Sequence, residues 1–412
     1  MIETSEHQER VILLGVELPD TENFDMSMEE LASLAKTAGA QVVSSYRQKR
    51  EKYDSKSLIG SGKLAEIKAI VDADEIDTVI VNDRLTPRQN VNLESELGVK
   101  VIDRMQLILD IFAMRARSHE GKLQVHLAQL KYMLPRLVGQ GVMLSRQAGG
   151  IGSRGPGESQ LELNRRSIRN QISDIERQLK VVEKNRETGR EKRTESQVFK
   201  IGLIGYTNAG KSTIMNVLTN DKQYEADELF ATLDATTKQI YLQNQFQVTL
   251  TDTVGFIQNL PTELVAAFKS TLEESRHVDL LLHVIDASDP NHAEHEKVVL
   301  NLLKDLDMLD IPRLAVYNKM DVAEHFAATA FPNVRISARD KDARSLLRRL
   351  IINEMREIFE PFSIRVHQNQ AYKLYDLNKI ALLDRYDFVE EYENITGYIN
   401  PKNKWRLEEF YD

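Results

Sequence analysis

The sequence contains no cysteine, one tryptophan and ten prolines among its 412 residues. Without cysteine the chain has no disulfide, thiol nucleophile, cysteine-ligated zinc site or iron–sulfur cluster, and we expect a reducing, cytoplasmic location. No apolar run approaches the roughly 18 residues that a membrane-spanning helix needs. The polar, acidic N-terminus predicts no signal or transit peptide.

Acidic residues outnumber basic ones, and the formal net charge is −9. This average argues against bulk affinity for nucleic acid. The charge is unevenly distributed, because residues 114–198 contain 17 Lys and Arg against 9 Asp and Glu. That segment therefore carries +8 and leaves −17 for the rest of the chain. Such a basic stretch between acidic flanks calls for a functional explanation.

At about 150 residues per domain, the length predicts two to three domains. Strand-like and helical patterns alternate in residues 1–118, which predicts a small parallel α/β domain. The same alternation in residues 199–360 predicts a second α/β domain. Residues 361–412 are acidic and tyrosine-rich, and we expect a small C-terminal domain with the tyrosines in its core.

Residues 119–198 predict an antiparallel helical hairpin and a linker. Leucines spaced three and four residues apart in 123–137 form one apolar stripe, and a similar stripe follows in 161–182. Between them, residues 139–157 hold seven of the 19 glycines and no acid, so we expect a flexible basic loop. A plain connector is the alternative for this loop, but long structureless loops are uncommon unless functional or disordered.

We expect the second helix of this hairpin to run for about 25 to 30 residues. The charged stretch 187–195 is expected to be a linker with little structure. A basic hairpin with a cationic tip suits contact with RNA phosphates, which supply much of the affinity for nucleic acids. A solvated coiled coil is the alternative, since charged residues dominate exposed helix faces in general.

A strand-like run leads into a match to the phosphate-binding pattern G-x-x-x-x-G-K-[ST] at residues 205–213. In this pattern the backbone N–H groups wrap the phosphates, the lysine reaches the β- and γ-phosphates, and the serine hydroxyl ligates Mg²⁺. The strand–loop–helix context makes an ordinary glycine turn a poor alternative. The predicted binding residues are Gly205, Tyr206, Thr207, Asn208, Ala209, Gly210, Lys211, Ser212 and Thr213.

The tetrapeptide DTVG ends the next strand-like run and supplies Asp252, Thr253, Val254 and Gly255. An acid at a strand end can hold Mg²⁺ through water, and a glycine N–H can contact the γ-phosphate. Alone, this pattern is weak. We predict Lys211, Asp252 and Gly255 as the catalytic residues.

Two further patterns follow strand-like runs and predict a guanine pocket. The NKMD run supplies Asn318, Lys319, Met320 and Asp321, and the ISAR run supplies Ser337, Ala338 and Arg339. Asp321 can accept two hydrogen bonds from guanine, which adenine does not offer, and Asn318 would tie this pocket to the phosphate loop. Four patterns in this order, each at the carboxyl end of a strand, resemble the translation-factor-like GTPases.

The segment between the first two patterns is expected to hold a threonine that ligates Mg²⁺, and spacing alone leaves Thr232, Thr236 and Thr237 open. Phe256 follows DTVG where many GTPases have a water-orienting glutamine, so intrinsic hydrolysis should be slow or assisted. Asn208 in the phosphate loop makes potassium activation a hypothesis, because an asparagine there often accompanies it in GTPases without that glutamine.

Four segments together resemble the HflX family of bacterial GTPases: residues 59–67, 123–137, 149–162 and 229–234. The resemblance spans nearly the whole chain. It implies a mixed α/β fold with a P-loop GTPase domain, an N-terminal parallel α/β domain with a helical hairpin, and a small C-terminal domain. It adds a nucleotide-binding run of Phe230, Ala231, Thr232, Leu233 and Asp234 and places Mg²⁺ on Ser212 and Thr232. Ala235 replaces a proline that the family often has, which leaves Thr236 a rival ligand.

The resemblance also implies a function. GTP is the expected substrate, Mg²⁺ the cofactor and K⁺ a candidate second cation. The expected partners are the large ribosomal subunit and the 70S ribosome, contacted by residues 119–198, with GTP-switched splitting of stalled or idle ribosomes. We expect a cytoplasmic monomer. Two alternatives remain: a GTPase of large-subunit assembly, and an RNA-remodelling ATPase in residues 1–118 with a regulatory GTPase domain.

Two other patterns are discounted. The GSGK run at 60–63 lacks the first glycine of a phosphate loop, and we expect a turn that opens a helix. His292 and His295 lack a third ligand in view, and we expect them on the surface of a helix.

Overall fold

The computed structural model describes residues 8–147, 156–194, 198–219, 229–230, 236–243, 246–252, 255–257, 276–324, 326–370, 372–389 and 391–410. These residues form two units. Unit 1 runs to Glu183 and includes Leu229 and Phe230, and unit 2 contains the other residues from Lys184 onward. Across these described ranges no helix is long and apolar enough to cross a membrane. The finer four-part division expected from the sequence stays a prediction.

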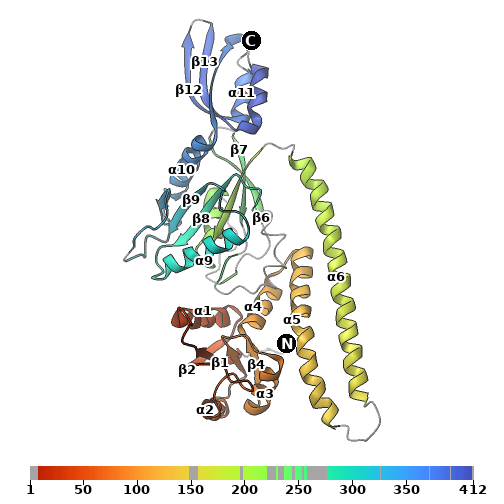
Figure 1. Cartoon of the computed structure of the whole chain (residues 1–412). Helices are drawn as coiled ribbons and strands as arrows, with labels where there is room; N and C mark the ends of the chain where they lie inside the picture. Colours follow the sequence, from red (N-terminus) through yellow and green to blue (C-terminus); the bar gives the residue numbers. More distant parts are fainter. Residues whose placement is uncertain are drawn as a thin grey trace, which may run out of the picture. The chain divides into compact units, whose positions relative to one another are not determined.

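Unit 1 begins with a four-stranded parallel sheet of strand order β2-β1-β3-β4 (Figure 1). Its elements are β1 (Arg10–Glu17), α1 (Phe24–Thr37), β2 (Gln41–Lys49), α2 (Ser61–Ala73), β3 (Thr78–Val81), α3 (Pro87–Leu97), β4 (Lys100–Asp103) and α4 (Arg104–Arg115). Alternate residues of β1, namely Ile12, Leu14 and Val16, pack with α2 and α3, while α1 and α4 contact each other. The predicted parallel α/β fold is confirmed, and the GSGK run opens α2 with Gly60 as its N-cap.

Asp103 joins the sheet to the helical hairpin. Its buried carboxylate accepts hydrogen bonds from the backbone N–H of Leu85 at 3.0 Å and, as the N-cap of α4, from that of Gln106 at 2.9 Å. The Tyr132 hydroxyl donates to it at 2.6 Å, and Arg136 forms an ion pair with it at 2.8 Å. Burial and the neighbouring carboxylate raise the pKa of Tyr132. Asp103 therefore fixes α5, which carries Tyr132 and Arg136, against β4.

The hairpin consists of α5 (His119–Gln147) and α6 (Pro156–Thr194), which lie side by side in Figure 1. Their predicted apolar stripes meet, because Leu127 and Leu130 of α5 cluster with Ile175 of α6. An exposed ion pair between Lys131 and Glu176, 2.8 Å long, also links the helices. The contact surface is thus a seam of apolar residues with charged residues outside it.

Both helices are longer than the sequence predicts. α5 continues through Gln147, so the expected loop of residues 139–157 is helical over its first part, and residues 148–155 lie outside the described residues. α6 has 39 residues and runs through the expected linker 187–195 as far as Thr194. The linker prediction was wrong because Glu, Lys and Arg are good helix formers, and the one glycine in 187–195 costs only about 1 kcal/mol. In residues 139–147, Leu, Met, Gln and Arg are good helix formers and outweigh two glycines.

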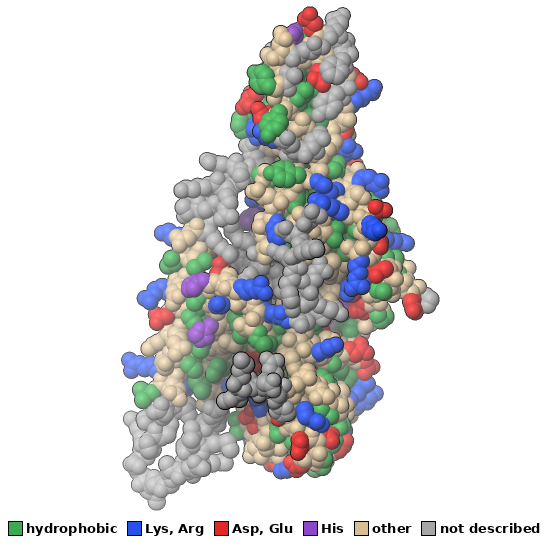
Figure 2. Space-filling view, turned by 180° about the vertical axis from the view of Figure 1, so that it is seen from behind, with side chains coloured by type: hydrophobic (Ala, Val, Ile, Leu, Met, Phe, Trp, Pro, Cys, Tyr) green, Lys and Arg blue, Asp and Glu red, His purple; other side chains and the backbone are tan. Residues whose placement is uncertain are grey.

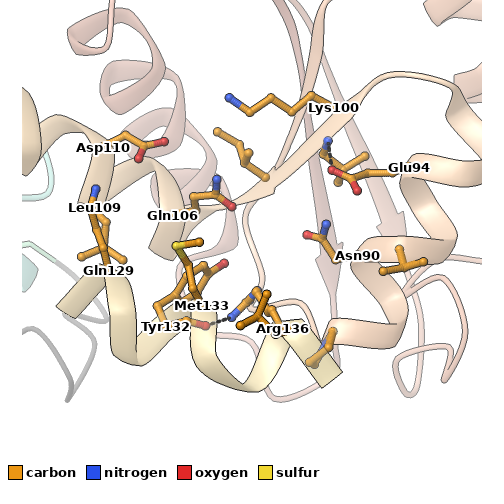
Figure 3. A pocket seen from close by; sticks show the side chains of 15 residues that line it. Asn90, Glu94, Lys100, Gln106, Leu109, Asp110, Gln129, Tyr132, Met133 and Arg136 are labelled. Carbon is orange, nitrogen blue, oxygen red and sulfur yellow. Dashed lines mark hydrogen bonds between the residues drawn. The ribbon is translucent and has the colours of Figure 1, made fainter. Parts of the chain in front are cut away.

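A cavity of about 380 Å³ lies in unit 1 among α3, β4, α4 and α5 (Figure 3). Its apolar wall includes Val101, Leu109 and Met133. Asp110 also lines it, and among the described residues this carboxylate has no hydrogen-bond or ion-pair partner. Burial raises the pKa of Asp110, the charge of Lys100 opposes this shift, and that of Glu9 adds to it.

Unit 2 contains a six-stranded sheet of order β10-β9-β8-β5-β7-β6, parallel except for β6. Its elements are β5 (Phe199–Gly205), α7 (Lys211–Thr219), β6 (Thr236–Tyr241), β7 (Gln247–Asp252), β8 (Leu280–Asp286), α9 (His292–Asp305), β9 (Arg313–Asn318), β10 (Asn333–Arg335) and α10 (Ala343–Ile358). One core joins the sheet to α7 and α10, and a second joins it to α9. The P-loop fold class predicted from the sequence is confirmed.

The C-terminal part is a three-stranded antiparallel sheet of order β11-β13-β12. Its elements are β11 (Glu360–His367), η1 (Gln368–Gln370), α11 (Tyr372–Ile380), β12 (Ala381–Val389), β13 (Tyr392–Ile399) and η2 (Pro401–Phe410). Isoleucine, leucine and valine fill most of its core, so the expectation of core tyrosines was wrong: Tyr372 is 69% and Tyr375 54% exposed. Figure 2 shows hydrophobic side chains on the surface of this C-terminal part, at the top of the view.

Candidate active site

The loop between β5 and α7 has a backbone conformation that requires glycine at two positions of the motif. Gly205 has φ +153°, and a Cβ there would lie 2.2 Å from the carbonyl oxygen of Val284. Gly210 has φ +94°, and a Cβ there would lie 2.2 Å from Nδ2 of Asn318. Asn208, at φ 61°, adopts the left-handed conformation that asparagine tolerates better than most residues. The loop therefore packs closely against both neighbouring strands, β8 and β9.

Lys211, the first residue of α7, is buried beside this loop. Its Nζ donates to the carbonyl oxygens of Gly205 at 3.0 Å and Tyr206 at 2.8 Å. Burial lowers the pKa of Lys211 to about 8, and the Asp252 carboxylate opposes this shift. The lysine is thus held at the helix N-terminus, where a phosphate would also meet backbone N–H groups.

Ser212 and Asp252 are brought together at the carboxyl edge of the sheet. Strands β5 and β7 pair in parallel, with Leu203 opposite Asp252, so the loop after β5 lies beside the end of β7. The Ser212 hydroxyl donates to Oδ2 of Asp252 at 2.9 Å. A hydroxyl and a carboxylate side by side are oxygen donors of the kind that Mg²⁺ prefers, so these residues fit the predicted metal site.

The segment after Asp252 contacts the phosphate loop through its backbone. The N–H of Thr207 donates to the carbonyl oxygen of Phe256 at 2.7 Å, and the N–H of Phe256 donates to that of Gly205 at 3.2 Å. The Phe256 ring is buried in a core cluster that includes Leu281 and Val299. The residue that follows DTVG therefore stabilises the core with its side chain and offers only its backbone to the loop.

The candidate base pocket lies at the ends of β9 and β10. Asn318 is buried; its Nδ2 donates to the carbonyl oxygen of Ala209 at 3.0 Å, and its Oδ1 accepts from the N–H of Ala338 at 2.9 Å. These bonds are the tie between phosphate loop and base pocket that the sequence predicts. The Asp321 side chain is exposed. Of the other predicted residues, Met320 donates its N–H to the carbonyl oxygen of Ile336, and the Ser337 hydroxyl accepts from the N–H of Arg339.

One residue near this site escaped the sequence analysis, and two histidines lie elsewhere than it expects. Asp286, at the end of β8, pairs with Lys319 at 2.7 Å, and the only sequence signal was its place after an apolar strand. His295 of α9 stacks on Tyr206, with ring centroids 3.8 Å apart, and lies 3.4 Å from the Asp289 carboxylate. His292 is buried, with Nδ1 2.9 Å from the carbonyl oxygen of Asp289. The expectation of surface histidines was therefore wrong, because His292 packs on Phe326 and His295 on Tyr206, both outside the strands of the sheet.

The expected magnesium threonine is only partly visible. Ala231, Thr232, Leu233, Asp234, Thr253 and Val254 lie outside the described residues. Thr236 lies in β6 opposite Asp252 in the antiparallel register, and the hydroxyls of Thr237 and Thr251 are 2.9 Å apart. Thr236 thus stays a rival, whereas Thr237 is engaged within the sheet.

Phe230 has its ring buried within unit 1. It belongs to unit 1, where its ring meets that of Phe112 edge-on at 4.5 Å and is almost fully buried. The N–H of Leu229 donates to the Thr37 hydroxyl at 3.2 Å. The contact of Phe230 with the nucleotide stays a prediction, and the structure describes its side chain only by this aromatic contact within unit 1.

Three family models match successive parts of the chain: "GTP-binding GTPase N-terminal" at residues 25–113, "GTP-binding GTPase Middle Region" at 115–193 and "50S ribosome-binding GTPase" at 200–319. The GTPase HflX of Caldanaerobacter subterraneus subsp. tengcongensis is 46% identical over 411 residues, which covers 100% of this chain and 95% of that protein. The chain belongs to the HflX GTPase family. It is accordingly a P-loop GTP hydrolase, as the sequence predicts.

A second relative agrees with this assignment, and the chain is also similar to solved structures. The GTPase HflX of Alkalihalophilus pseudofirmus is 55% identical over 314 residues, 76% of this chain and 74% of that protein. Among solved structures, a GTP-binding protein from the archaeon Sulfolobus solfataricus in complex with GDP is 25% identical, with a TM-score of 0.47, and covers 84% of this chain and 98% of that chain. A structure described as the SsGBP and GDP complex is 26% identical, with a TM-score of 0.50 and the same coverage.

Proposed function

We propose that this GTPase binds the large ribosomal subunit and the 70S ribosome and, in its GTP-bound form, dissociates stalled or idle ribosomes. The observation that carries the proposal is the basic hairpin formed by α5 and α6. Its apolar seam is used up between the two helices, so the charged faces point away from it. The description of the matching family model, a 50S ribosome-binding GTPase, supports the same partner.

Exposed basic residues follow one another along α6. They are Arg166, Arg169, Arg177, Lys180 and Lys184. Side chains of this kind bind nucleic-acid phosphates with little regard to sequence, and the released counterions make the affinity depend on salt. Ribosomal RNA offers such a polyanionic surface.

The nucleotide site would act as the switch. Asp321 accepts hydrogen bonds from guanine, Asn318 holds the base pocket to the phosphate loop, and Lys211 contacts the β- and γ-phosphates. Ser212, Asp252 through water, and Thr232 would hold Mg²⁺, which neutralises phosphate charge during hydrolysis. The N–H of Gly255 contacts the γ-phosphate, and the exposed amide of Asn208 is our candidate for a K⁺ ligand. Hydrolysis removes the γ-phosphate contacts and lowers the affinity for the ribosome.

The first experiment measures GTP turnover by the purified protein alone, with large subunits and with 70S ribosomes, in potassium and in sodium buffer. We expect ribosomal particles to raise turnover about tenfold or more, which is worth about 1.4 kcal/mol of barrier. Sedimentation of the 70S particles with GTP tests splitting directly. Turnover that no particle stimulates would refute the ribosomal partner, and stimulation by immature large subunits alone would favour the assembly alternative.

A charge-reversed pair, Arg166→Glu with Arg169→Glu, tests the hairpin. We expect weaker ribosome stimulation and a shallower salt dependence with unchanged intrinsic turnover, because both side chains are exposed and lie outside unit 2. Lys68→Glu is the matched control, since it reverses an equally exposed charge on α2. Equal effects of the control and the pair would contradict a specific role for the hairpin.

Asp321→Asn tests the choice of base. The change should weaken GTP binding about tenfold or more, as expected for lost hydrogen bonds to a charged group, and leave ATP binding no weaker. If ATP turnover were high and unaffected while GTP turnover was negligible, the RNA-remodelling ATPase alternative would gain support.

A further inference from the structure

The candidate hydrolysis site has a buried hydroxyl for which the described residues offer no hydrogen-bond partner. Thr207, the third residue of the phosphate loop, is only 6% exposed, and its Oγ1 is buried without a hydrogen-bond partner among the described residues. A buried donor left without a partner destabilises the folded state. Such groups are rare in folded proteins and call for a specific reason.

The backbone and the methyl group of Thr207 are both held in place. Its N–H donates to the carbonyl oxygen of Phe256 at 2.7 Å. Its Cγ2 lies 2.8 Å from the point where a Cβ on Gly255 would be, so this methyl packs on the backbone of Gly255. Threonine is stiff at χ1 because its Cβ is branched, and fixing the methyl therefore also fixes the hydroxyl.

The place of this side chain connects it with the phosphates. The same point beside Gly255 lies 3.1 Å from Nζ of Lys211. Lys211 and Gly255 are the groups that the proposed function assigns to the β- and γ-phosphates. Thr207 and Lys211 therefore both lie beside Gly255.

Phe256, which follows Gly255, cannot assist hydrolysis with its side chain. Many GTPases orient the attacking water with a glutamine after the glycine of DTVG, but here Phe256 has its ring in the core. A group that assists hydrolysis must then come from another residue, and Thr207 of the phosphate loop lies beside Gly255. A hydroxyl can donate to a phosphoryl oxygen, whereas the Phe256 ring cannot.

We propose that the Thr207 hydroxyl donates a hydrogen bond to a γ-phosphate oxygen of GTP and strengthens it as charge develops there during hydrolysis. The hydroxyl keeps its proton; water attacks phosphorus, the bond to the β-phosphate oxygen breaks, and the proton of the water passes to the phosphate products. The inference rests on the proposed nucleotide site. It assigns to the threonine side chain a contribution to the selectivity for GTP over GDP.

Thr207→Val and Thr207→Ser separate the hydroxyl from the methyl group. Valine keeps the branched shape, the packing on Gly255 and the backbone bond to Phe256, and removes only the hydroxyl. Serine keeps the hydroxyl and removes the methyl. Thr219→Val is the matched control, because its hydroxyl bonds only to backbone carbonyls within α7.

The measurements are the affinities for fluorescent GDP and for a non-hydrolysable GTP analogue, both with Mg²⁺, and single-turnover GTP hydrolysis by the free protein. For Thr207→Val we expect an unchanged GDP affinity, a loss of analogue affinity of about tenfold and a larger loss of hydrolysis rate, as for one hydrogen bond to a charged oxygen. Thr207→Ser keeps the hydroxyl but loses the methyl that holds it, so its losses should be smaller than those of Thr207→Val. Thr219→Val should stay close to the unaltered protein in all three measurements.

Two results would overturn the inference. One is a valine variant that binds the analogue and hydrolyses GTP normally, in which case the hydroxyl has no contact with the γ-phosphate. The other is an equal loss of GDP and analogue affinity, which would make the hydroxyl a structural part of the loop. Failure of the unaltered protein to bind any guanine nucleotide would instead refute the nucleotide site itself, and the three outcomes are distinct.

Discussion

Replacing Asp103 by alanine should destabilise the packing of α5 against β4, called the Asp103 joint below. The loss of stability should be far larger than that caused by a change at the surface of unit 1. The carboxylate is fully buried and receives four groups: two backbone N–H groups, the Tyr132 hydroxyl and the Arg136 guanidinium. Alanine leaves all four donors without their acceptor. Arg136 is the most costly of them, because its side chain is only 16% exposed and its charge cannot fully reach water.

The magnitude follows from these partners. Breaking a buried ion pair by removing one member costs about 3–5 kcal/mol. The lost N-cap of α4 costs about 1 kcal/mol by itself, but effects of neighbouring groups do not add fully. We therefore expect Asp103→Ala to destabilise the joint by about 4 kcal/mol, a large share of the 5–15 kcal/mol that holds a typical domain together.

The assay is native-state hydrogen exchange of the α4 and α5 amides, since two units need not unfold together. Amides that exchange through opening of this joint should do so about a thousandfold faster, as 1.4 kcal/mol corresponds to a factor of ten. Trp405 fluorescence reports on unit 2 and should show no change. Lys131→Met is the control: its pair with Glu176 is 45% exposed on both sides and is worth at most about 1 kcal/mol.

A double variant, Asp103→Ala with Arg136→Met, should be more stable than the single variant, because it no longer strands a cation. An acceleration of less than tenfold in Asp103→Ala, or a double variant that is no better, would refute this account of the joint.

Three further predictions concern single side chains. Asn318→Ala should weaken GDP and GTP binding alike, by about tenfold or more, because it leaves the carbonyl oxygen of Ala209 and the N–H of Ala338 without these partners. A nucleotide titration checks this, and a loss of GTP binding alone would contradict it. Gly210→Ala should abolish nucleotide binding, because at φ +94° the new Cβ would clash with Nδ2 of Asn318. The control Gly39→Ala has a similar φ of +86° but nothing within 4 Å of the new Cβ, so it should cost only about 1 kcal/mol of stability. Equal effects of the two variants on nucleotide binding would argue against the clash. Asp110→Asn should stabilise unit 1 at neutral pH, because burial raises the pKa of Asp110 and the folded chain therefore binds its proton more tightly than the unfolded chain does. The contribution of Asp110 to the free energy of unfolding falls as pH rises from 3.8 through the raised folded pKa. Urea unfolding followed against pH should show that the stability gained by the asparagine vanishes below this pH window.

The phosphate loop could be predicted from the sequence because its requirements are local. Gly205 and Gly210 mark a backbone with positive φ and close approach, and the strand before them and the helix after them are visible in the hydrophobic pattern. The same holds for Asn318, which lies at a strand end and therefore at the edge where the loops meet.

The Asp103 joint could not be predicted in the same way. Its partners lie 18 to 33 residues away in sequence except for Gln106, and no spacing marks Tyr132 or Arg136 as different from other residues of α5. The length of α6 and the aromatic contact of Phe230 were missed for a related reason. Helix ends in charged sequence depend on small differences in propensity, and the burial of one ring depends on the surface that happens to receive it.

Phe256 raises the question of which group assists GTP hydrolysis. The sequence establishes that the residue after DTVG cannot hydrogen-bond to water through its side chain. The structure adds that its ring is a core residue, packed where α9 meets the sheet, so a polar replacement there would cost stability before it could assist hydrolysis. Assistance must then come from elsewhere: from a group already beside the γ-phosphate position, such as the Thr207 hydroxyl, from a cation, or from the ribosome. Thr207→Val, potassium replacement and ribosome stimulation each remove or add one of these three sources, and their effects on turnover can be measured separately.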